Sequence, residues 1–158
     1  MPGEARSLIL GVGNWFRSDD AAGLVAAEEL RAGPLPPGVE ALALGADEFA
    51  LMEALLSADR AVVLDAVDMG SAPGTVRVFT LGEALALAPG ATLDLHTFGL
   101  AQALRTATAL GMGARVTIVG VEPETVAPGE GLSAAVLAKL PEMKEAALRA
   151  VAVDGLRR

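Results

Sequence analysis

Residues 7–20, SLILGVGNWFRSDD, decide the fold of this chain. They begin with an apolar run of strand length, which breaks at Gly11 and Gly13. Two carboxylates, Asp19 and Asp20, then open a segment with helical spacing. In α/β folds, ligands bind outside the carboxyl ends of the strands, where loops from several strands meet. The first strand is therefore expected to place acidic side chains at the edge of the sheet where ligands bind.

Apolar runs of strand length recur along the chain and alternate with segments of helical spacing. This alternation predicts an α/β fold, a single three-layer α/β/α domain with a mostly parallel, twisted, five-stranded sheet. The expected strands cover about residues 7–13, 39–44, 60–66, 75–79 and 115–121. A turn signal at Ala72-Pro73-Gly74 precedes the fourth strand, so that strand could be antiparallel to its neighbour. A chain of 158 residues suits one domain, expected to span residues 1–158.

Four helical segments are expected between and after these strands. They cover residues 18–31, with Leu24, Val25 and Leu30 facing inward, residues 47–57, residues 97–110, and a C-terminal segment from about Ser133. Ser18 is the expected N-cap of the first helix. Pro141 either kinks the last helix or begins a second one. The third segment places His96 at a helix N-terminus.

The composition excludes several classes of protein. A formal net charge of -8 argues against nucleic-acid binding, which requires a basic surface. The chain has no cysteine, so disulfides, thiolate metal sites and cysteine nucleophiles are excluded. It shows neither a secretory signal nor the run of about 20 apolar residues that a membrane span needs. We therefore expect a cytoplasmic protein without a membrane partner, and a monomer because no heptad seam is present.

Three polar side chains follow the expected strands: Asp20 after the first, Asp65 at the end of the third, and His96, the single histidine, after the fourth. Two carboxylates and one imidazole suit nickel or zinc and leave positions open for water or substrate. Each residue also has a structural explanation. Acidic residues in a first helical turn stabilise the helix dipole by about 0.3–1 kcal/mol, and His96 could cap its helix. Asp65 favours function more strongly, because a carboxylate ending a buried strand needs a partner or a metal.

The two glycines also allow a dinucleotide-binding interpretation, in which Asp47 would contact a ribose. Phe16 stands where G-x-G-x-x-G has its third glycine, so the glycine that packs the helix against the strand is missing from the motif. The alternative is a tight turn with positive φ at one or both glycines. No G-x-S-x-G motif marks a serine nucleophile. Trp15 and Phe16 either contact a protein partner or cover the end of the sheet.

Six short motifs are distributed over nearly the whole chain. They are GVGN at 11–14, SDD at 18–20, LDA at 64–66, HTFGL at 96–100, VGVEPE at 119–124 and GLS at 131–133. Their identity and order resemble the hydrogenase maturation endopeptidases, which trim the C-terminal extension from the large subunit of nickel-iron hydrogenases. The resemblance implies an aspartyl-type endopeptidase whose partner is the hydrogenase large-subunit precursor.

The resemblance also implies a metal site formed by Asp20, Asp65 and His96. Its ion would be nickel already seated in the precursor, so that cleavage reports nickel insertion, and zinc or another divalent ion could act as a surrogate. Relatives carry Glu or Asp at the position of Asp20, and the shorter side chain here reaches less far. Gly13 and Asn14 are candidate substrate contacts, and Gly45 is a third because its segment resembles a glycine-rich segment of the family.

Three functional hypotheses follow. In the first, a nickel-dependent endopeptidase uses the metal to polarise the scissile carbonyl or to lower the pKa of an attacking water. Its catalytic residues are not assigned, and the three metal-site residues are the best candidates. In the second, the same ligands serve a non-catalytic nickel sensor or chaperone in hydrogenase assembly. In the third, the glycine loop binds a nucleotide, which predicts thermal stabilisation by a dinucleotide.

Overall fold

The computed structural model describes residues 5–87 and 99–156. Its five strands are β1 (Ser7–Val12), β2 (Val39–Gly45), β3 (Arg60–Ala66), β4 (Val76–Thr80) and β5 (Arg115–Val121). They form one sheet in the order β2-β1-β3-β5-β4. Neighbouring strands are parallel except for β4, which is antiparallel to β5. The expected mostly parallel sheet with one antiparallel strand is confirmed.

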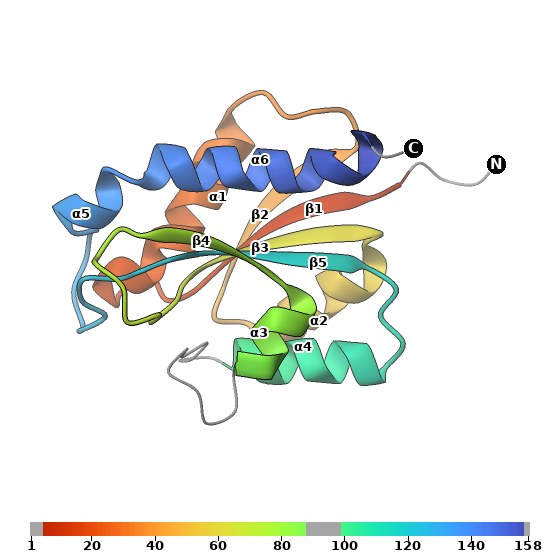
Figure 1. Ribbon diagram of the computed structural model, residues 1–158, viewed down its shortest axis with the longest axis horizontal. Coiled ribbons are helices and arrows are strands. Elements are labelled where there is room, and N and C mark those ends of the chain that lie inside the picture. Colours follow the sequence, from red (N-terminus) through yellow and green to blue (C-terminus); the bar gives the residue numbers. More distant parts are fainter. Residues whose placement is uncertain (1–4, 88–98, 157–158) are drawn as a thin grey trace.

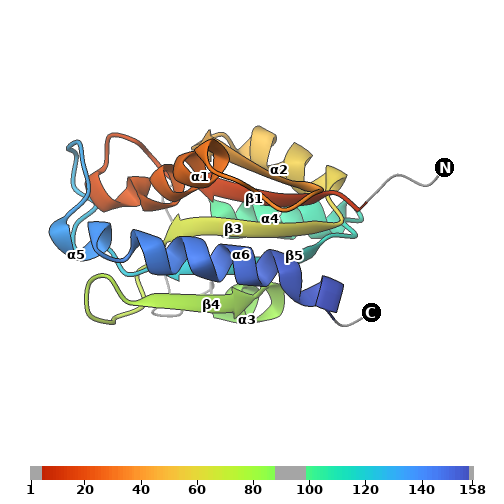
Figure 2. The ribbon, with the colours of Figure 1, turned by 90° about the horizontal axis from the view of Figure 1, so that it is seen from above.

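Helices cover both faces of this sheet. They are α1 (Ala22–Ala32), α2 (Glu48–Ser57), α3 (Leu81–Leu87), α4 (Leu100–Ala109), α5 (Ala134–Leu137) and α6 (Leu140–Leu156). A short 3-10 helix, η1 (Ser18–Ala21), precedes α1. Figure 1 shows α1 and α6 on one face and α2, α3 and α4 on the other, and Figure 2 shows α1 and α6 side by side over the sheet. This is the predicted three-layer α/β/α arrangement.

The central strands are apolar on both faces. Along β1, Leu8 and Leu10 pack in the cluster that contains α2 and α4, whereas Ile9 packs in the cluster with α1 and α6. Successive side chains of a strand point to opposite faces, so a strand covered on both sides needs a continuous apolar run. Val62 and Val63 repeat this division in β3. The short aliphatic runs of the sequence therefore determine the middle layer.

Helix α1 contacts the backbone of the sheet closely at two glycines, Gly11 of β1 and Gly23 of α1. A Cβ atom on Gly11 would lie 2.3 Å from the carbonyl oxygen of Gly23, and one on Gly23 would lie 2.1 Å from that of Leu64. Such separations leave no room for a side chain at either position. The helix-packing glycine that the dinucleotide motif lacks at residue 16 is thus supplied by Gly23, one turn into the helical segment. The motif itself lacks its third glycine, as predicted, and a glycine outside the motif packs the helix.

Ser18 does not cap the first helix as predicted. Its backbone has φ 52°, and its hydroxyl donates to the carbonyl oxygen of Ala127 at 2.8 Å. The expected helix from residue 18 begins instead as η1, and the α-helix starts at Ala22. Leu24 and Leu30 are buried as expected, whereas Val25 is half-buried. A contact with a loop 109 residues away decided the conformation of Ser18, and local sequence could not indicate it.

The remaining helices differ from prediction in their boundaries. Ser133 caps α5 by accepting a hydrogen bond from the Val136 amide, and Pro141 lies in the first turn of α6, so the proline begins a second helix. Helix α4 begins at Leu100, after Gly99 in the left-handed region with φ 81°. The expected start of this helix at residue 97 lies outside the described residues. Helix α3 was not predicted.

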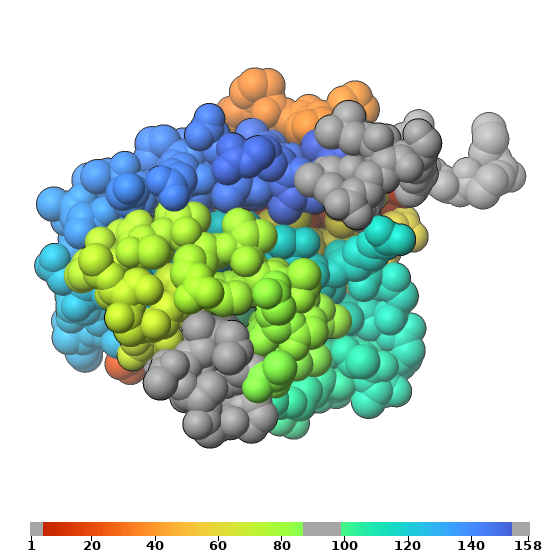
Figure 3. All heavy atoms as spheres, viewed as in Figure 1, coloured from red at the N-terminus to blue at the C-terminus, as the bar shows by residue number. Residues whose placement is uncertain are grey.

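Strand β4 closes one edge of the sheet. Figure 3 shows it at the surface between α6 and α3. Its exposed Arg77 lies over the ring of the buried Phe79, with the guanidinium carbon 5.1 Å from the ring centroid. A charged side chain on an edge strand disfavours pairing with another chain. In the described part of the chain, no helix is both long and apolar enough to cross a bilayer.

Candidate active site

The candidate site lies where the connections of β1 and β3 diverge. Strand β1 pairs with β2 on one side and with β3 on the other, so the chain leaves these central strands in opposite directions. Such a switch point at the carboxyl ends of parallel strands is where open α/β sheets bind ligands. Asp20 lies in η1, the first element after β1, and Asp65 is the penultimate residue of β3. The fold thus brings the two predicted carboxylates to one place.

Both carboxylates are almost completely buried, with exposed fractions of 1% for Asp20 and 2% for Asp65. An Asp20 carboxylate oxygen, Oδ2, accepts a hydrogen bond of 2.9 Å from the Asn14 amide. Oδ1 of Asp65 accepts one of 2.9 Å from the amide of Ala66. Backbone donors therefore hold both side chains at the end of the sheet.

Burial raises the pKa of the Asp65 carboxyl group well above its usual value. The negative charge of Asp20 raises this pKa further, whereas the hydrogen bond from Ala66 lowers it. Desolvation and a like charge both disfavour the ionised form of a carboxylate. A cation between the two groups would relieve both effects, so this pair of residues fits the carboxylate part of the predicted metal site.

The third predicted ligand, His96, lies outside the described residues, together with the loop that contains it. Within residues 5–87 and 99–156 there is no group of three or more His, Cys, Asp or Glu side chains that could hold a metal ion. The described structure therefore joins Asp20 to Asp65 and leaves the predicted contribution of His96 a prediction.

The three candidate substrate contacts adjoin this acidic pair. Gly13 has φ 135° and donates from its amide to the carbonyl oxygen of Gly45 at 3.2 Å. A Cβ on Gly13 would lie 2.0 Å from the carbonyl oxygen of Asp20, so the loop closes tightly upon itself. Asn14 supplies the amide that binds Asp20, and its own side-chain oxygen accepts from the Phe16 amide at 2.8 Å. Gly45 has φ 68° and open space where a side chain would be.

Asp19 plays a different part from its neighbour. It is fully buried, and both of its carboxylate oxygens accept hydrogen bonds from the segment after β5. It lies in the first turn of η1, as the helix-dipole interpretation expected, but its carboxylate is also bound by a distant segment. The SDD motif indicated that both aspartates are candidates. The sequence around them does not distinguish the one that binds a distant loop from the one that lies at the site.

Glu122 is a buried acid of the VGVEPE motif to which the sequence alone assigned no function. Its Oε1 accepts hydrogen bonds from the amides of Met69 and Ser71, at 2.8 and 3.0 Å. These bonds hold the loop that follows β3, which begins just after Asp65 in the chain. Asp47, the candidate ribose contact, accepts from the amide of Ala50 and caps α2. Gly11 is needed for the packing of α1 on the sheet. Gly11 and Asp47, the two residues behind the dinucleotide interpretation, therefore both have structural roles.

Trp15 and Phe16 are exposed beside the site, with 42% and 66% of their surfaces accessible. The backbone of Phe16 is nevertheless fixed, since its amide donates to Asn14 and its carbonyl oxygen accepts from the amide of Gly129 at 2.9 Å. Large aromatic side chains on a rigid loop lose little conformational freedom on binding a partner. Of the two interpretations of this pair, the exposure favours contact with a protein over covering the end of the sheet.

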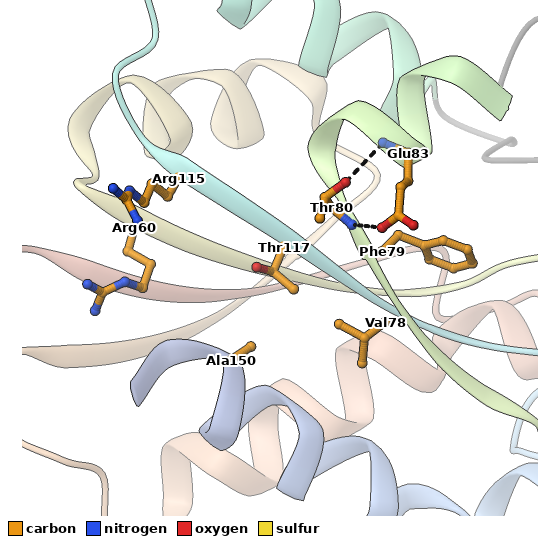
Figure 4. A pocket seen from close by; sticks show the side chains of 8 residues that line it. All are labelled: Arg60, Val78, Phe79, Thr80, Glu83, Arg115, Thr117 and Ala150. Carbon is orange, nitrogen blue, oxygen red and sulfur yellow. Dashed lines mark hydrogen bonds between the residues drawn. The ribbon is translucent and has the colours of Figure 1, made fainter. Parts of the chain in front are cut away.

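A pocket of about 240 Å³ lies at the other end of the strands. It is lined in part by Arg60 and Arg115, the first residues of β3 and β5. Figure 4 shows Thr80 and Glu83 joined across its rim by two hydrogen bonds. These bonds, of 2.8 and 3.1 Å, form a capping box that begins α3, and the Thr80 amide lowers the pKa of the Glu83 carboxyl group. The pocket contains neither Asp20 nor Asp65, so it is separate from the candidate site.

The sheet order and the buried acids at its switch point make this an α/β/α protein with a candidate ligand site built on carboxylates. The family model for hydrogenase maturation proteases, HycI, matches residues 25–150. The chain belongs to this family of peptidases.

Individual relatives agree with the family model. Hydrogenase 2 maturation protease of Escherichia coli (strain K12) is 33% identical over 154 residues, which cover 96% of this chain and 93% of the relative. Hydrogenase expression/formation protein HupD of Rhizobium leguminosarum bv. viciae is 31% identical, over 94% of this chain and 75% of its own. The solved structure of the hydrogenase maturating endopeptidase HybD from E. coli matches with a TM-score of 0.84 and 32% identity, covering 95% of this chain and 94% of that chain. The predicted resemblance is confirmed.

Proposed function

We propose that this chain removes the C-terminal extension from the large-subunit precursor of a nickel-iron hydrogenase after nickel has been inserted. Asp20, Asp65 and His96 recognise the inserted nickel, so that cleavage is a checkpoint for metal loading. The observation that carries the proposal is the buried pair Asp20 and Asp65 at the sheet's switch point, in a chain of the maturation protease family.

The proposal explains why two carboxylates are buried together. Their mutual repulsion and desolvation disfavour the metal-free fold, and such an arrangement persists where function requires it. A divalent ion brought by the substrate neutralises this charge, and His96 completes a set of two oxygen ligands and one nitrogen ligand suited to nickel, with zinc as a surrogate. The ion supplies Lewis-acid chemistry toward the scissile carbonyl or an attacking water.

The residues around the pair orient it and contact the precursor. The Asn14 amide holds one carboxylate oxygen of Asp20 in place. Gly13 and Gly45 bring two loop backbones together beside the site, and the open space at Gly45 leaves room for an extended segment of the precursor. Trp15 and Phe16 provide apolar contact with the same partner. We expect the protein to act as a monomer in the cytoplasm.

The test is intact-mass analysis of a cognate large-subunit precursor incubated with the protein, with and without prior nickel loading. The variants are Asp65→Asn and His96→Ala. The matched control is Asp68→Asn, an exposed acid three residues beyond Asp65 whose side chain caps only a local turn, through the amide of Gly70. Each variant is first shown to fold by circular dichroism.

We expect loss of a C-terminal fragment only from the nickel-loaded precursor, with the wild type and Asp68→Asn but with neither site variant. Cleavage by Asp65→Asn and His96→Ala at the wild-type rate would contradict the assigned metal site. Nickel binding by the wild type, without cleavage of a correctly loaded cognate precursor, would contradict the endopeptidase and support the sensor or chaperone hypothesis instead.

A further inference from the structure

The Asp19 side chain, next to the candidate site, accepts four hydrogen bonds. Its Oδ1 accepts from the Ser133 amide at 2.7 Å. Its Oδ2 accepts from the Ser133 hydroxyl at 2.8 Å and from the amides of Glu124 and Thr125 at 2.9 and 3.3 Å. The side chain has no exposed surface. All four donors belong to the segment between β5 and α5, more than 100 residues further along the chain.

The turn that carries Asp19 also carries Asp20. Both belong to the 3-10 helix η1, in which successive side chains are rotated by about 120°. Asp19 engages the segment after β5, whereas Asp20 accepts from Asn14 and interacts electrostatically with Asp65. Because the two residues share one turn, fixing the direction of the first side chain fixes the direction of the second.

We infer that Asp19 is a positioning residue: its four hydrogen bonds fix η1 and thereby hold the Asp20 carboxylate beside Asp65. The consequence for metal recognition rests on the proposed function, whereas the positioning itself does not. A carboxylate is required, since the amide of an asparagine has one acceptor oxygen. If that oxygen kept the three bonds of Oδ2, the NH2 group would meet the amide N–H of Ser133, and two donors would face each other.

The effect of Asp19 can be separated from general attachment of the two loops. Other bonds join the same segments: the Nε of Arg17 donates to Val126, the hydroxyl of Ser18 to Ala127, and the amide of Ser18 to the carbonyl oxygen of Gly129. The amide of Gly129 donates in return to Phe16. The amide of Asp19 also donates to the carbonyl oxygen of Thr125. None of these bonds involves the Asp19 carboxylate, so its loss should leave the loops attached and loosen the turn that carries Asp20.

The Asn14 amide reports on this orientation, because it donates to Asp20 Oδ2. Amide hydrogen exchange is followed by NMR in the wild type, Asp19→Asn, Ser133→Ala and the control Leu30→Ala. Leu30 is a buried residue of the last turn of α1, so its truncation weakens the fold far from η1 along the helix. We expect Asp19→Asn to speed exchange of the Asn14 amide by about tenfold relative to amides of the central strands. Ser133→Ala, which removes one of the four bonds, should have a smaller effect, and Leu30→Ala should leave the ratio unchanged.

A second readout connects positioning to recognition. With nickel-loaded precursor, Asp19→Asn is expected to raise KM more than it lowers kcat, whereas Leu30→Ala should change neither at a temperature where both are folded. If the Asn14 amide of Asp19→Asn exchanges as slowly as that of the wild type, the inference is overturned. Faster Asn14 exchange in Asp19→Asn, combined with wild-type cleavage by Asp20→Asn, would instead overturn the proposed function and leave the positioning role standing.

Discussion

Replacing Gly23 by alanine tests whether close packing of α1 on the sheet maintains the site. The added Cβ would lie 2.1 Å from the carbonyl oxygen of Leu64, 2.6 Å from its carbon and 3.0 Å from the amide nitrogen of Asp65. Real Cβ atoms essentially never approach other atoms within 3.0 Å, so the shortest of these separations must grow by about 0.9 Å. All three neighbours are backbone atoms, and none can rotate away. Helix α1 or the end of β3 must therefore move, and the end of β3 carries Asp65.

The expected loss of stability follows from two opposing effects. Overpacking a close-packed interior costs about 1–3 kcal/mol, and a clash with rigid backbone belongs at the upper end, about 3 kcal/mol. Alanine is the better helix former by about 1 kcal/mol, which offsets part of this loss. The free energy of unfolding should therefore fall by about 2 kcal/mol, a large part of the stability of an ordinary domain.

The assay is urea unfolding followed by far-ultraviolet circular dichroism, because the single tryptophan, Trp15, is partly exposed and reports weakly on the core. The matched control is Gly33→Ala at the other end of α1. There the nearest atom to a new Cβ is the carbonyl oxygen of Glu29 at 3.7 Å, and the backbone has φ -103°. This control should be neutral or more stable by up to about 1 kcal/mol. If Gly23→Ala proves as stable as Gly33→Ala, α1 does not approach the backbone of β3 as closely as inferred.

Three further outcomes are expected. Because the folded-state pKa of Asp65 is raised, its protonated form favours folding below the unfolded-state pKa, and this stability is lost as pH rises through the folded value. In chelator, Asp65→Asn should therefore unfold at higher urea than the wild type at neutral pH, with the difference shrinking in acid; equal midpoints at neutral pH would contradict this. Phe16→Ser should change stability by less than about 0.5 kcal/mol but slow precursor cleavage, whereas the similarly exposed Leu110→Ser should do neither; equal cleavage by both variants would exclude Phe16 as a contact. Gly45→Ala should cost about 1–2 kcal/mol in urea unfolding, from its left-handed φ of 68° and not from a clash, and Gly45→Asn should cost less.

The fold was predictable because its strands are apolar on both faces. Runs such as Leu8 to Leu10 and Val62 to Val63 are too short and too continuous for amphipathic helices, and turn residues or helical spacing separate them. Their alternation with helices determines a parallel sheet covered on both sides. The antiparallel position of β4 was anticipated from a turn signal. Its pairing with β5 on the far side of β3 depends on tertiary contacts that local sequence does not encode.

The site was predictable only in part, because its residues are defined by distant partners. Asp20 and Asp65 could be proposed together, since each follows a strand and parallel strands end at one edge of the sheet. The functions of Ser18 and Asp19 depend on a loop more than 100 residues away. Gly23 appears in sequence as an ordinary helical residue, and only the approach of Leu64 explains why a side chain is excluded.

The consecutive acids Asp19 and Asp20 show how a fold can keep a carboxylate in an unfavourable place. Burial and the neighbouring charge of Asp20 raise the pKa of the Asp65 carboxyl group. In the metal-free state, this pair of carboxylates therefore destabilises the folded structure. Relaxation is resisted from two directions: four hydrogen bonds hold Asp19, and Gly23 lets α1 press against the backbone at Asp65. Loss of either restraint should let the carboxylates separate and reduce their repulsion. Variants at Asp19 and Gly23 should accordingly impair the proposed nickel-dependent cleavage more than equally destabilising variants elsewhere, because the strain that they release belongs to the arrangement that a divalent ion would recognise.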